Sequence, residues 1–409
     1  MVMKSVGLGL MMCCLLVGGC TTSAGGSPPH PLSYSGPVSS SAGSAVSAAA
    51  LAAGRWSVLP ASGLAASSVA VLAWDGTELI QVDAGRNARS PGPAAGYDPR
   101  RGSWRRLSPA PDGVAGPGTV SVWTGRELFA MGVGQAGPAD RDACCVAGLF
   151  DPIADRWRST PPVPLHSPGA VAVWTGREVV VADVVTRRQP LLEAAGYDPA
   201  ANRWTRLDPP VGRPDHPPMV VEMVAVPDGV LVWSLWSRME RTGPGSITIY
   251  AGTDLFRLAP DGHWSDLTRS WPQDQNVVSP VFTGSSVLLA PGQVWCGPCS
   301  HPMPYGEHAV FVDPRTLART DIAHGPADDV VPRLAWTGDA ILAINVWGSM
   351  RGEGAAVGPG DTFVWNRRTG TWVKAAGAPL ALADTPLIWT GRELLTLARN
   401  GRLMAFRPQ

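Results

Sequence analysis

The residues whose types and spacing are best suited to chemistry lie in the segment 293–308, which holds two cysteines and two histidines. Cys296 and Cys299 stand three positions apart, and His301 and His308 follow them. Thiolates and imidazoles at such a spacing can bind zinc, so a metal site of these four side chains is one interpretation. A structural disulfide between the two cysteines is the interpretation that we favour, because the chain begins with an export segment. A redox-active dithiol is the third.

The same segment is similar to the thioredoxin active-site motif, since it contains Trp295-Cys296-Gly297-Pro298-Cys299. In thioredoxins this motif opens a helix, and the helix end lowers the pKa of the first thiol. Here Pro302 and Pro304 follow at once and prevent a helix of useful length. The context therefore does not fit a thioredoxin.

Arginines and a few other polar or aromatic side chains form a second set of candidates. They fall in long, dissimilar segments between apolar runs, where binding residues concentrate. Several arginines around one axis could receive a carboxylate, a phosphate or an acidic sugar. Solvated loop charges are the alternative, which we favour for the arginines taken alone. The set comprises Arg86, Arg89, Asp140, Arg141, Asp142, Arg187, Arg188, Arg238, Arg241, Arg351 and Glu353, with Trp295, His301, Tyr305 and His308.

A glutamate recurs at one position of a repeated pattern, as Glu78, Glu127, Glu178 and Glu393. A carboxylate can act as a general acid or base. Four copies that point to different sectors of one architecture are better explained by pairing in turns or between units. For the same reason we expect the repeated tryptophans to pack between units rather than to bind sugar rings.

The elements that position these residues come from an internal repeat. The residue before a short turn marks each copy, and successive markers are 49 to 56 residues apart. The seven markers are Trp74, Trp123, Trp174, Val226, Phe282, Trp336 and Trp389. In the clearest copy, residues 169–211, four short apolar runs are separated by a Thr-Gly turn, a loop and a Tyr-Asp-Pro turn, which predicts four strands.

Two further markers support the repeat. An aromatic or apolar residue followed by Asp-Pro recurs at Tyr97, Phe150, Tyr197 and Val312, and a weaker version stands at Trp365. A tryptophan stands seven residues after four of these, at Trp104, Trp157, Trp204 and Trp372. This pattern resembles the kelch repeat, although the glycine pair that usually closes the second kelch strand is absent. The resemblance covers residues 54–409 and implies a β-propeller.

The two ends of the repeat region predict how the ring closes. The last copy stops near Phe406, before its fourth strand, whereas Gly54–Pro60 looks like a fourth strand with nothing before it. Placing Trp56 in the last sheet completes the ring without leaving exposed strand edges. We therefore predict an all-β fold: a seven-bladed β-propeller of four-stranded antiparallel blades, with the last blade closed by the N-terminal strand.

The blade order bears on the remaining cysteines. Cys144 and Cys145 lie in the second copy and Cys296 and Cys299 in the fifth, which are nearly opposite in a ring of seven. Long-range bridges would need both loops to arch over the centre. We expect two local bridges instead.

The start of the chain predicts export. Residues 1–20 contain Lys4, a short apolar run and Val17-Gly18-Gly19-Cys20, which resembles the cleavage box of bacterial lipoproteins. That resemblance implies that Cys20 carries the lipid; an ordinary secretory signal peptide is the alternative. Residues 21–53 are rich in Ser, Gly, Ala and Pro, which favours a flexible tether before the propeller at 54–409.

Composition narrows the partners. Lys and Arg number 33, as do Asp and Glu, so no basic field favours nucleic acid or an anionic membrane surface. We expect an extracytoplasmic monomer attached to the bacterial cell membrane only by its lipid anchor. We expect it to need no cofactor and to bind an envelope protein or glycan through the rim of the ring that carries the long, dissimilar loops.

The alternative function is a kelch-type extracytoplasmic enzyme acting on a sugar. Copper radical oxidases of that fold bind copper through two tyrosines and two histidines; Tyr250 and Tyr305 with His301 and His308 would be the available set. Sialic-acid isomerases of that fold need converging Arg, Glu and His, for which no motif is recognisable. No catalytic residue is therefore assigned, and a binding or scaffolding module is the preferred function.

Overall fold

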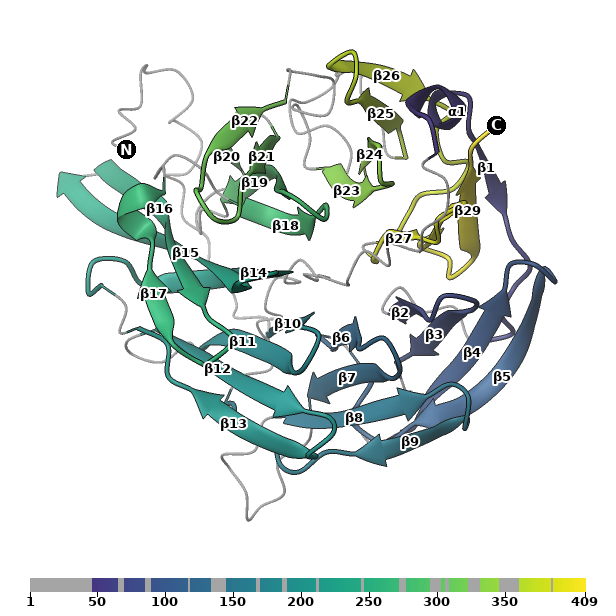
Figure 1. The fold of residues 1–409 in the computed structure, drawn as a ribbon, viewed down its shortest axis with the longest axis horizontal. Helices are drawn as coiled ribbons and strands as arrows, with labels where there is room; N and C mark the ends of the chain where they lie inside the picture. The colour runs from purple at the N-terminus through teal and green to yellow at the C-terminus, as the bar shows by residue number, and fades with distance from the viewer. Residues whose placement is uncertain are drawn as a thin grey trace, which may run out of the picture.

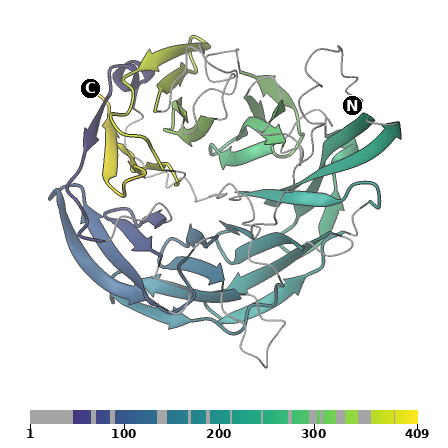
Figure 2. The same ribbon diagram turned by 180° about the vertical axis from the view of Figure 1, so that it is seen from behind.

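In the computed structural model, the protein is a closed ring of seven antiparallel sheets around one axis, seen from its two sides in Figures 1 and 2. The structure describes residues 46–64, 70–84, 90–116, 118–133, 145–166, 170–185, 190–210, 213–243, 246–271, 277–294, 303–305, 309–322, 332–345, 360–383 and 385–409. The predicted seven-bladed β-propeller is confirmed.

Each sheet is one blade, numbered here along the chain from blade 1 to blade 7. Blade 1 contains β2 (Ala70–Trp74), β3 (Leu79–Asp83), β4 (Gly92–Asp98) and β5 (Ser103–Ala110). Blade 2 contains β6 (Val120–Trp123), β7 (Leu128–Val133), β8 (Cys145–Asp151) and β9 (Arg156–Ser159). Blade 3 contains β10 (Val171–Trp174), β11 (Val179–Val185), β12 (Leu191–Asp198) and β13 (Arg203–Leu207). Blade 4 contains β14 (Pro218–Val226), β15 (Gly229–Gly243), β16 (Ser246–Leu258) and β17 (Trp264–Asp266), followed by the short 3₁₀ helix η1 (Thr268–Ser270).

Blade 5 contains β18 (Val277–Phe282), β19 (Val287–Val294), β21 (Val310–Val312) and β22 (Arg319–Asp321), with β20 (Met303–Tyr305) added beside the far end of β19. Blade 6 contains β23 (Pro332–Trp336), β24 (Ala340–Asn345), β25 (Thr362–Asn366) and β26 (Thr371–Ala375). Blade 7 contains β27 (Ile388–Trp389), β28 (Leu394–Leu397), β29 (Leu403–Arg407) and β1 (Arg55–Val58).

The ring closes where the two ends of the repeat region meet. β1 pairs with β29 in antiparallel register, and Trp56 lies opposite Phe406. Their rings are 5.4 Å apart, and the Trp56 indole donates to Thr362 Oγ1 of blade 6 at 3.0 Å. A strand from one end of the region therefore completes the sheet formed by the other end, as predicted.

Two kinds of tight turn repeat around one rim. In the first, a glycine adopts φ between +87° and +101° in blades 1, 2, 3, 5, 6 and 7, a conformation that costs glycine little. In the second, the side chain of the Asp before Pro accepts hydrogen bonds from the two backbone N–H groups that follow the proline, as Asp198 does from Ala200 and Ala201. These backbone donors lower the pKa of Asp198. Local residue chemistry therefore fixes this rim.

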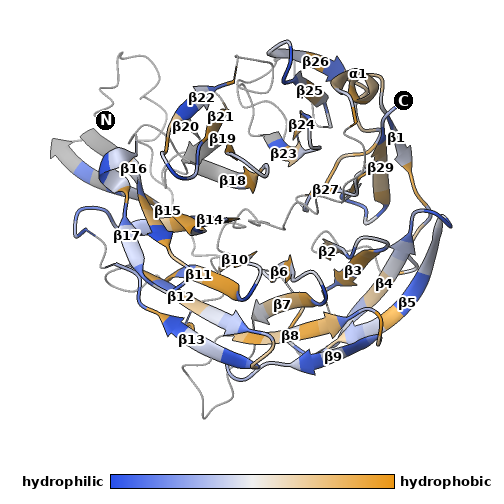
Figure 3. Cartoon of the chain, in the orientation of Figure 1, coloured by the Kyte–Doolittle hydropathy of each residue, from blue (hydrophilic) through white to orange (hydrophobic). Residues whose placement is uncertain are grey.

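The core lies between blades rather than within them. Among the described residues, seven hydrophobic clusters each join two neighbouring blades, including blades 7 and 1. All seven residues of β11 are buried, whereas β9 and β13 are largely exposed or half-buried, and Figure 3 shows the same inward gradient of hydropathy. Each sheet thus buries both faces by contacting its neighbours.

One short helix belongs to the packed body. α1 (Ala48–Ala52) places Leu51, fully buried, in the cluster between blades 6 and 7. The sequence predicted a flexible tether up to residue 53. The structure shows instead that the described end of that segment, residues 46–53, packs against the ring. Burial of Leu51 compensates for the small intrinsic stability of a five-residue helix.

Blade 4 departs most from the pattern. β15 has 15 residues and β16 has 13, and residues 237–243 and 246–251 of this hairpin form an arm that extends beyond the ring (Figure 1). β14 pairs with β15 only as far as Trp236, and β17 pairs only with Phe256–Leu258. The arm lies on the rim that carries the connections between second and third strands, opposite the tight turns.

None of the helices in the part of the chain that the structure covers could span a lipid bilayer.

Candidate functional site

The repeated tryptophans and glutamates are scaffold, as predicted. The Trp157 indole donates to Ser108 O of the preceding blade at 3.1 Å, and its ring lies 5.3 Å from that of Phe150. The Trp104 indole donates to Pro60 O at 2.8 Å. These side chains tie blades 1 and 2 to the preceding blade, and Trp204 does so for blade 3 through Thr160 Oγ1 at 3.4 Å.

Three of the four repeated glutamates pair with an arginine. Arg105 binds Glu78 through Nε and Nη2 at 2.8 to 3.1 Å, and Arg407 binds Glu393 at 2.6 Å. Glu78 lies directly over Gly96, where a Cβ would come within 2.2 Å of its carboxylate. The missing side chain at Gly96 lets Glu78 reach across β4 to Arg105 on β5. Sequence reasoning predicted that the glutamates pair but did not identify the arginines.

The blade 4 arm carries the predicted rim residue whose side chain the structure describes. Arg238 lies opposite Tyr250 on the paired strand, and its guanidinium carbon is 4.8 Å from the centroid of the tyrosine ring. Arg238 is exposed. The sequence placed Arg238 and Arg241 in a loop, but both lie in β15, because the hairpin continues past the edge of the blade.

The base of the arm is held by a histidine. His216 stacks on Trp236, with ring centroids 3.9 Å apart and planes 11° apart. Its Nδ1 is 2.9 Å from Asp254 Oδ1. A carboxylate can only accept, so Nδ1 donates this bond and Nε2 is left on the other side, 3.8 Å from Asp215 Oδ2.

The electrostatics of the His216–Asp254 pair follow from its burial. Asp254 is 5% exposed as a side chain and His216 is 14% exposed. Burial raises the pKa of the Asp254 carboxyl, and the hydrogen bond from His216 lowers it in part. The pair fixes the connection that enters blade 4 against the third strand of that blade, so the arm begins from a rigid base.

A second histidine–carboxylate pair lies at the entry to blade 3. His166 Nδ1 is 2.9 Å from both carboxylate oxygens of Glu193, and the His166 backbone N–H donates to Glu193 Oε2 at 3.1 Å. Arg206 contacts Glu193 Oε1 at 3.3 Å. Sequence reasoning missed both pairs. The available signal was a carboxylate inside an apolar third strand, which requires a partner.

The side chains of the arm are compatible with a binding surface. Within the described residues, no group of three or more His, Cys, Asp or Glu side chains is arranged to hold a metal ion. One face of the arm carries Trp236 at its base, then Arg238 over Tyr250, then the exposed Glu240. Guanidinium and aromatic groups of this kind are enriched where proteins bind partners.

The remaining predicted site residues are placed as follows. Cys145 lies buried at the first residue of β8, and the backbone of Tyr305 lies opposite Gly292 in β20. Arg241 is placed in β15 by its backbone alone. The residues Cys20, Arg86, Arg89, Asp140, Arg141, Asp142, Cys144, Arg187, Arg188, Trp295, Cys296, Cys299, His301, His308, Arg351 and Glu353 lie outside the described residues. The metal alternative at 296–308 therefore stays a prediction.

Comparisons with known proteins gave no family assignment. No protein-family model matches the chain, and no curated protein matches it. The architecture rests on the repeats and geometry of this chain.

Proposed function

We propose that the protein is a lipid-anchored β-propeller of the bacterial cell envelope that binds a partner through its variable loop rim. The observation that carries the proposal is the contrast between the two rims of the ring. One rim repeats the same tight turns, whereas the other carries the long, dissimilar connections and the blade 4 arm. A closed ring provides a rigid base for such a surface, which is compatible with a binding or scaffolding module.

The arm supplies the clearest contact surface on that rim. Its exposed Arg238 is held over Tyr250, so little side-chain entropy is lost when a partner binds. The His216–Asp254 contact fixes the base from which it extends. We infer that an envelope protein or glycan contacts this face. A kelch-like origin of the blades stays part of the proposal, on the strength of the Asp-Pro turns and the tryptophans that follow them.

The anchor is proposed from the sequence alone. Cys20 follows a positively charged start, a short apolar run and small residues, and a tether rich in small residues joins it to the ring. In a bacterial host, wild-type protein is expected in the membrane fraction with an incorporated acyl label, and Cys20→Ala is expected to lose both. Labelling that survives the substitution would contradict the assignment of Cys20.

Position-specific crosslinking tests the binding rim. A photoreactive residue placed at Arg238 is expected to crosslink an envelope component in intact cells, because that side chain is exposed on the arm. Arg368 is the matched control position: it is an arginine in the Asn366–Gly370 turn of blade 6, on the opposite rim. The same probe at Arg368 is expected to give no such product.

The outcomes separate the proposal from its alternatives. A defined product from position 238 that disappears with Tyr250→Ala supports recognition by the arm. Equal products from positions 238 and 368 would mean non-specific collision, and products from position 368 alone would place recognition on the wrong rim. Either result overturns the proposal.

The cysteines are proposed to form two local bridges, Cys144–Cys145 and Cys296–Cys299. Peptide mass spectrometry of the exported, unreduced protein is expected to find both pairs. A linked peptide that joins the 144–145 segment to the 296–299 segment would contradict local pairing.

A further inference from the structure

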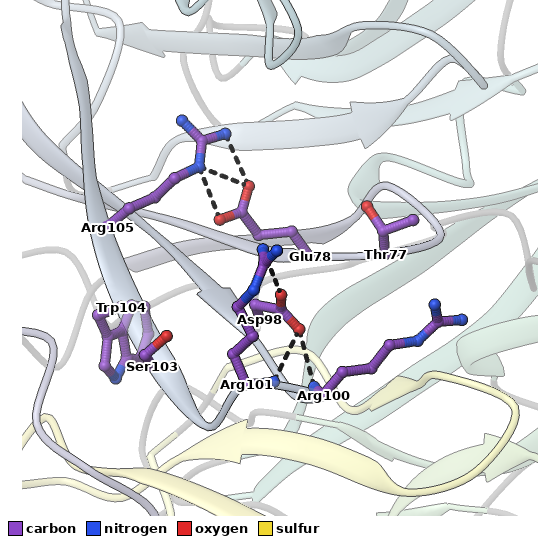
Figure 4. A pocket seen from close by; sticks show the side chains of 8 residues that line it. All are labelled: Thr77, Glu78, Asp98, Arg100, Arg101, Ser103, Trp104 and Arg105. Carbon is purple, nitrogen blue, oxygen red and sulfur yellow. Dashed lines mark hydrogen bonds and ion pairs between the residues drawn. The ribbon is translucent and has the colours of Figure 1, made fainter.

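A pocket of about 450 Å³, whose lining side chains are drawn in Figure 4, opens on the rim of tight turns, which faces away from the arm. It lies in blade 1, between the turn that joins β2 to β3 and the turn that joins β4 to β5. β5 supplies the remaining wall, including the ring of Trp104. The volume is within the range of small-molecule sites.

The charges that line the pocket leave one cation in excess. Both oxygens of Glu78 are bound by Arg105. Asp98 accepts from the backbone N–H groups of Arg100 and Arg101 at 2.8 and 3.2 Å, and from Arg101 Nη1 at 3.2 Å. Among the lining residues, two carboxylates therefore face three guanidinium groups, and the carboxylate oxygens are already bound; Asp75 and Asp155 act on Arg105 from outside the lining.

Arg100 is the cation left over. Its guanidinium makes no hydrogen bond or ion pair with any residue that the structure describes, and it carries no dashed line in Figure 4. Its backbone N–H is fixed by Asp98, so the side chain starts from a constrained position. A guanidinium placed in this way is suited to a carboxylate or phosphate oxygen.

Blade 1 differs from blades 2 and 3 at several positions that line this pocket. The positions of Thr77 and Ser103, on the pocket walls, are occupied by arginine in blade 2 and in blade 3. Conversely, the turn positions of Arg100 and Arg101 are Ala200 and Ala201 in blade 3. Blade 1 therefore has small hydroxyl residues where blades 2 and 3 have arginine, and arginines where blade 3 has alanine. That exchange opens a cavity and supplies its charge.

We propose that the blade 1 pocket binds a small organic monocarboxylate that carries hydroxyl groups. Arg100 binds the carboxylate, and Arg101 adds a second donor beside it. Thr77 Oγ1 already donates to Asp75, so it accepts from a ligand hydroxyl, while Ser103 Oγ can donate or accept. The single excess charge matches a carboxylate better than a phosphate, which carries nearly two charges at neutral pH. This site is separate from the proposed partner-binding rim.

Calorimetric titration of the full chain in detergent tests the proposal with four probes: gluconate, sorbitol, acetate and inorganic phosphate. Gluconate is expected to bind in the millimolar range or more tightly. Sorbitol lacks the charge and acetate lacks the hydroxyls, so each is expected to bind at least tenfold more weakly, as is phosphate. Arg100→Ala, which gives blade 1 the residue that blade 3 carries, is expected to weaken gluconate binding at least about tenfold.

Arg368→Ala is the matched control. Arg368 occupies the position of Arg100 in the blade 6 turn, where its backbone N–H likewise donates to the side chain before it, Asn366 Oδ1. Its removal is expected to leave gluconate binding unchanged. The proposal is overturned if gluconate does not bind, if sorbitol or phosphate binds as tightly as gluconate, or if the two arginine variants lose affinity equally.

Discussion

Blades 2 and 3 carry the same turn with the same glutamate, and yet the two carboxylates are in opposite situations. Glu127 of blade 2 receives two hydrogen bonds of 2.9 Å from Arg158. In blade 3 the position of Arg158 is occupied by Thr205, which cannot reach across the strand, and burial raises the pKa of Glu178. One residue on the fourth strand decides whether the repeated carboxylate stabilises the blade or opposes its folding.

Arg158 also joins two blades. It donates to Tyr197 Oη at 3.2 Å and to Pro199 O at 3.1 Å, both in blade 3. Arg105 makes the corresponding contact with Pro152 O of blade 2 at 3.3 Å. The arginine therefore acts as a clasp between successive blades, and the turn that ends each third strand supplies the acceptor. A repeat of this kind adds stability at each interface in turn.

Removal of the blade 2 clasp is expected to have the largest effect. Arg158→Ala leaves the partly buried Glu127 without its cation and leaves Tyr197 and Pro199 without their donor. We expect a loss of about 2 kcal/mol, between the values for an exposed pair and a broken buried pair, because the Arg158 side chain is 36% exposed. Thermal and denaturant unfolding of the full chain measures it.

Two controls sharpen this comparison. Arg156→Ala removes an exposed arginine from the same strand, and it is expected to change stability by less than about 0.5 kcal/mol. Arg158→Lys keeps the charge but loses the paired guanidinium donors, so its loss of stability is expected to fall between those of the two alanine variants. Equal unfolding midpoints for Arg158→Ala and Arg156→Ala would refute the clasp.

Asp83 extends the comparison to a carboxylate without any cation in the described residues around it. Gln81 Nε2 donates to its Oδ1 at 2.8 Å, while Oδ2 and Gln81 Oε1 are buried and unpaired. Burial raises the pKa of Asp83 to about 6, and the Gln81 hydrogen bond lowers it in part. The folded state thus holds a proton that the unfolded state releases at a pKa near 3.8. The loss of folding stability caused by Asp83 therefore grows as pH rises from about 4 through about 6.

Asp83→Asn is therefore expected to stabilise the protein at pH 7 by about 1.5 kcal/mol and to have no effect near pH 3.5. An amide at this position can also donate to Gln81 Oε1. Unfolding midpoints across this pH range measure the difference from wild type, with Asp112→Asn, an exposed aspartate, as the control. A difference that does not depend on pH would argue against a raised pKa.

The parts of the fold that the sequence predicted are those fixed by local chemistry. Thr-Gly and Asp-Pro turns specify their own geometry through side-chain hydrogen bonds, so the strand count and the rim of tight turns followed from them. The closure of blade 7 followed from the missing fourth strand near Phe406 and the extra one at Trp56. Neither inference needed a contact between distant residues to be known in advance.

The parts that escaped prediction depend on geometry between blades. The first strand of the arm contains Arg238, Glu240 and Arg241 and no alternating apolar pattern, and the alternation of Ser246-Ile247-Thr248-Ile249 on the second strand was not recognised as its partner. The burial of Leu51 depends on the space between blades 6 and 7. Arg158 lies 31 residues from Glu127, and only the pairing of three strands brings the two together.

The smallest change in stability is expected when the arginine of this contact is introduced into blade 3. Thr205 lies opposite Gly196, and Glu178 lies over that glycine within 2.6 Å of where a Cβ would be, the geometry seen for Glu78 and Gly96 in blade 1. Thr205→Arg is thus expected to pair with Glu178, lower its pKa and stabilise the protein by about 1 kcal/mol at pH 7. The gain over wild type is complete above the raised pKa of Glu178 in the wild-type fold and is lost as pH falls through the lowered pKa of Glu178 in the variant.

A double-mutant cycle with Glu178→Gln isolates this pairing. The gain from Thr205→Arg should vanish in the Glu178→Gln background; an equal gain there would mean that the new arginine acts through another contact. The gain should also stay below the loss from Arg158→Ala. Leu258 of blade 4 stands where Tyr197 stands in blade 3, so an arginine at 205 finds no phenol to bind across the interface. A clasp that works within blade 3 but not between blades 3 and 4 would separate the two halves of its role.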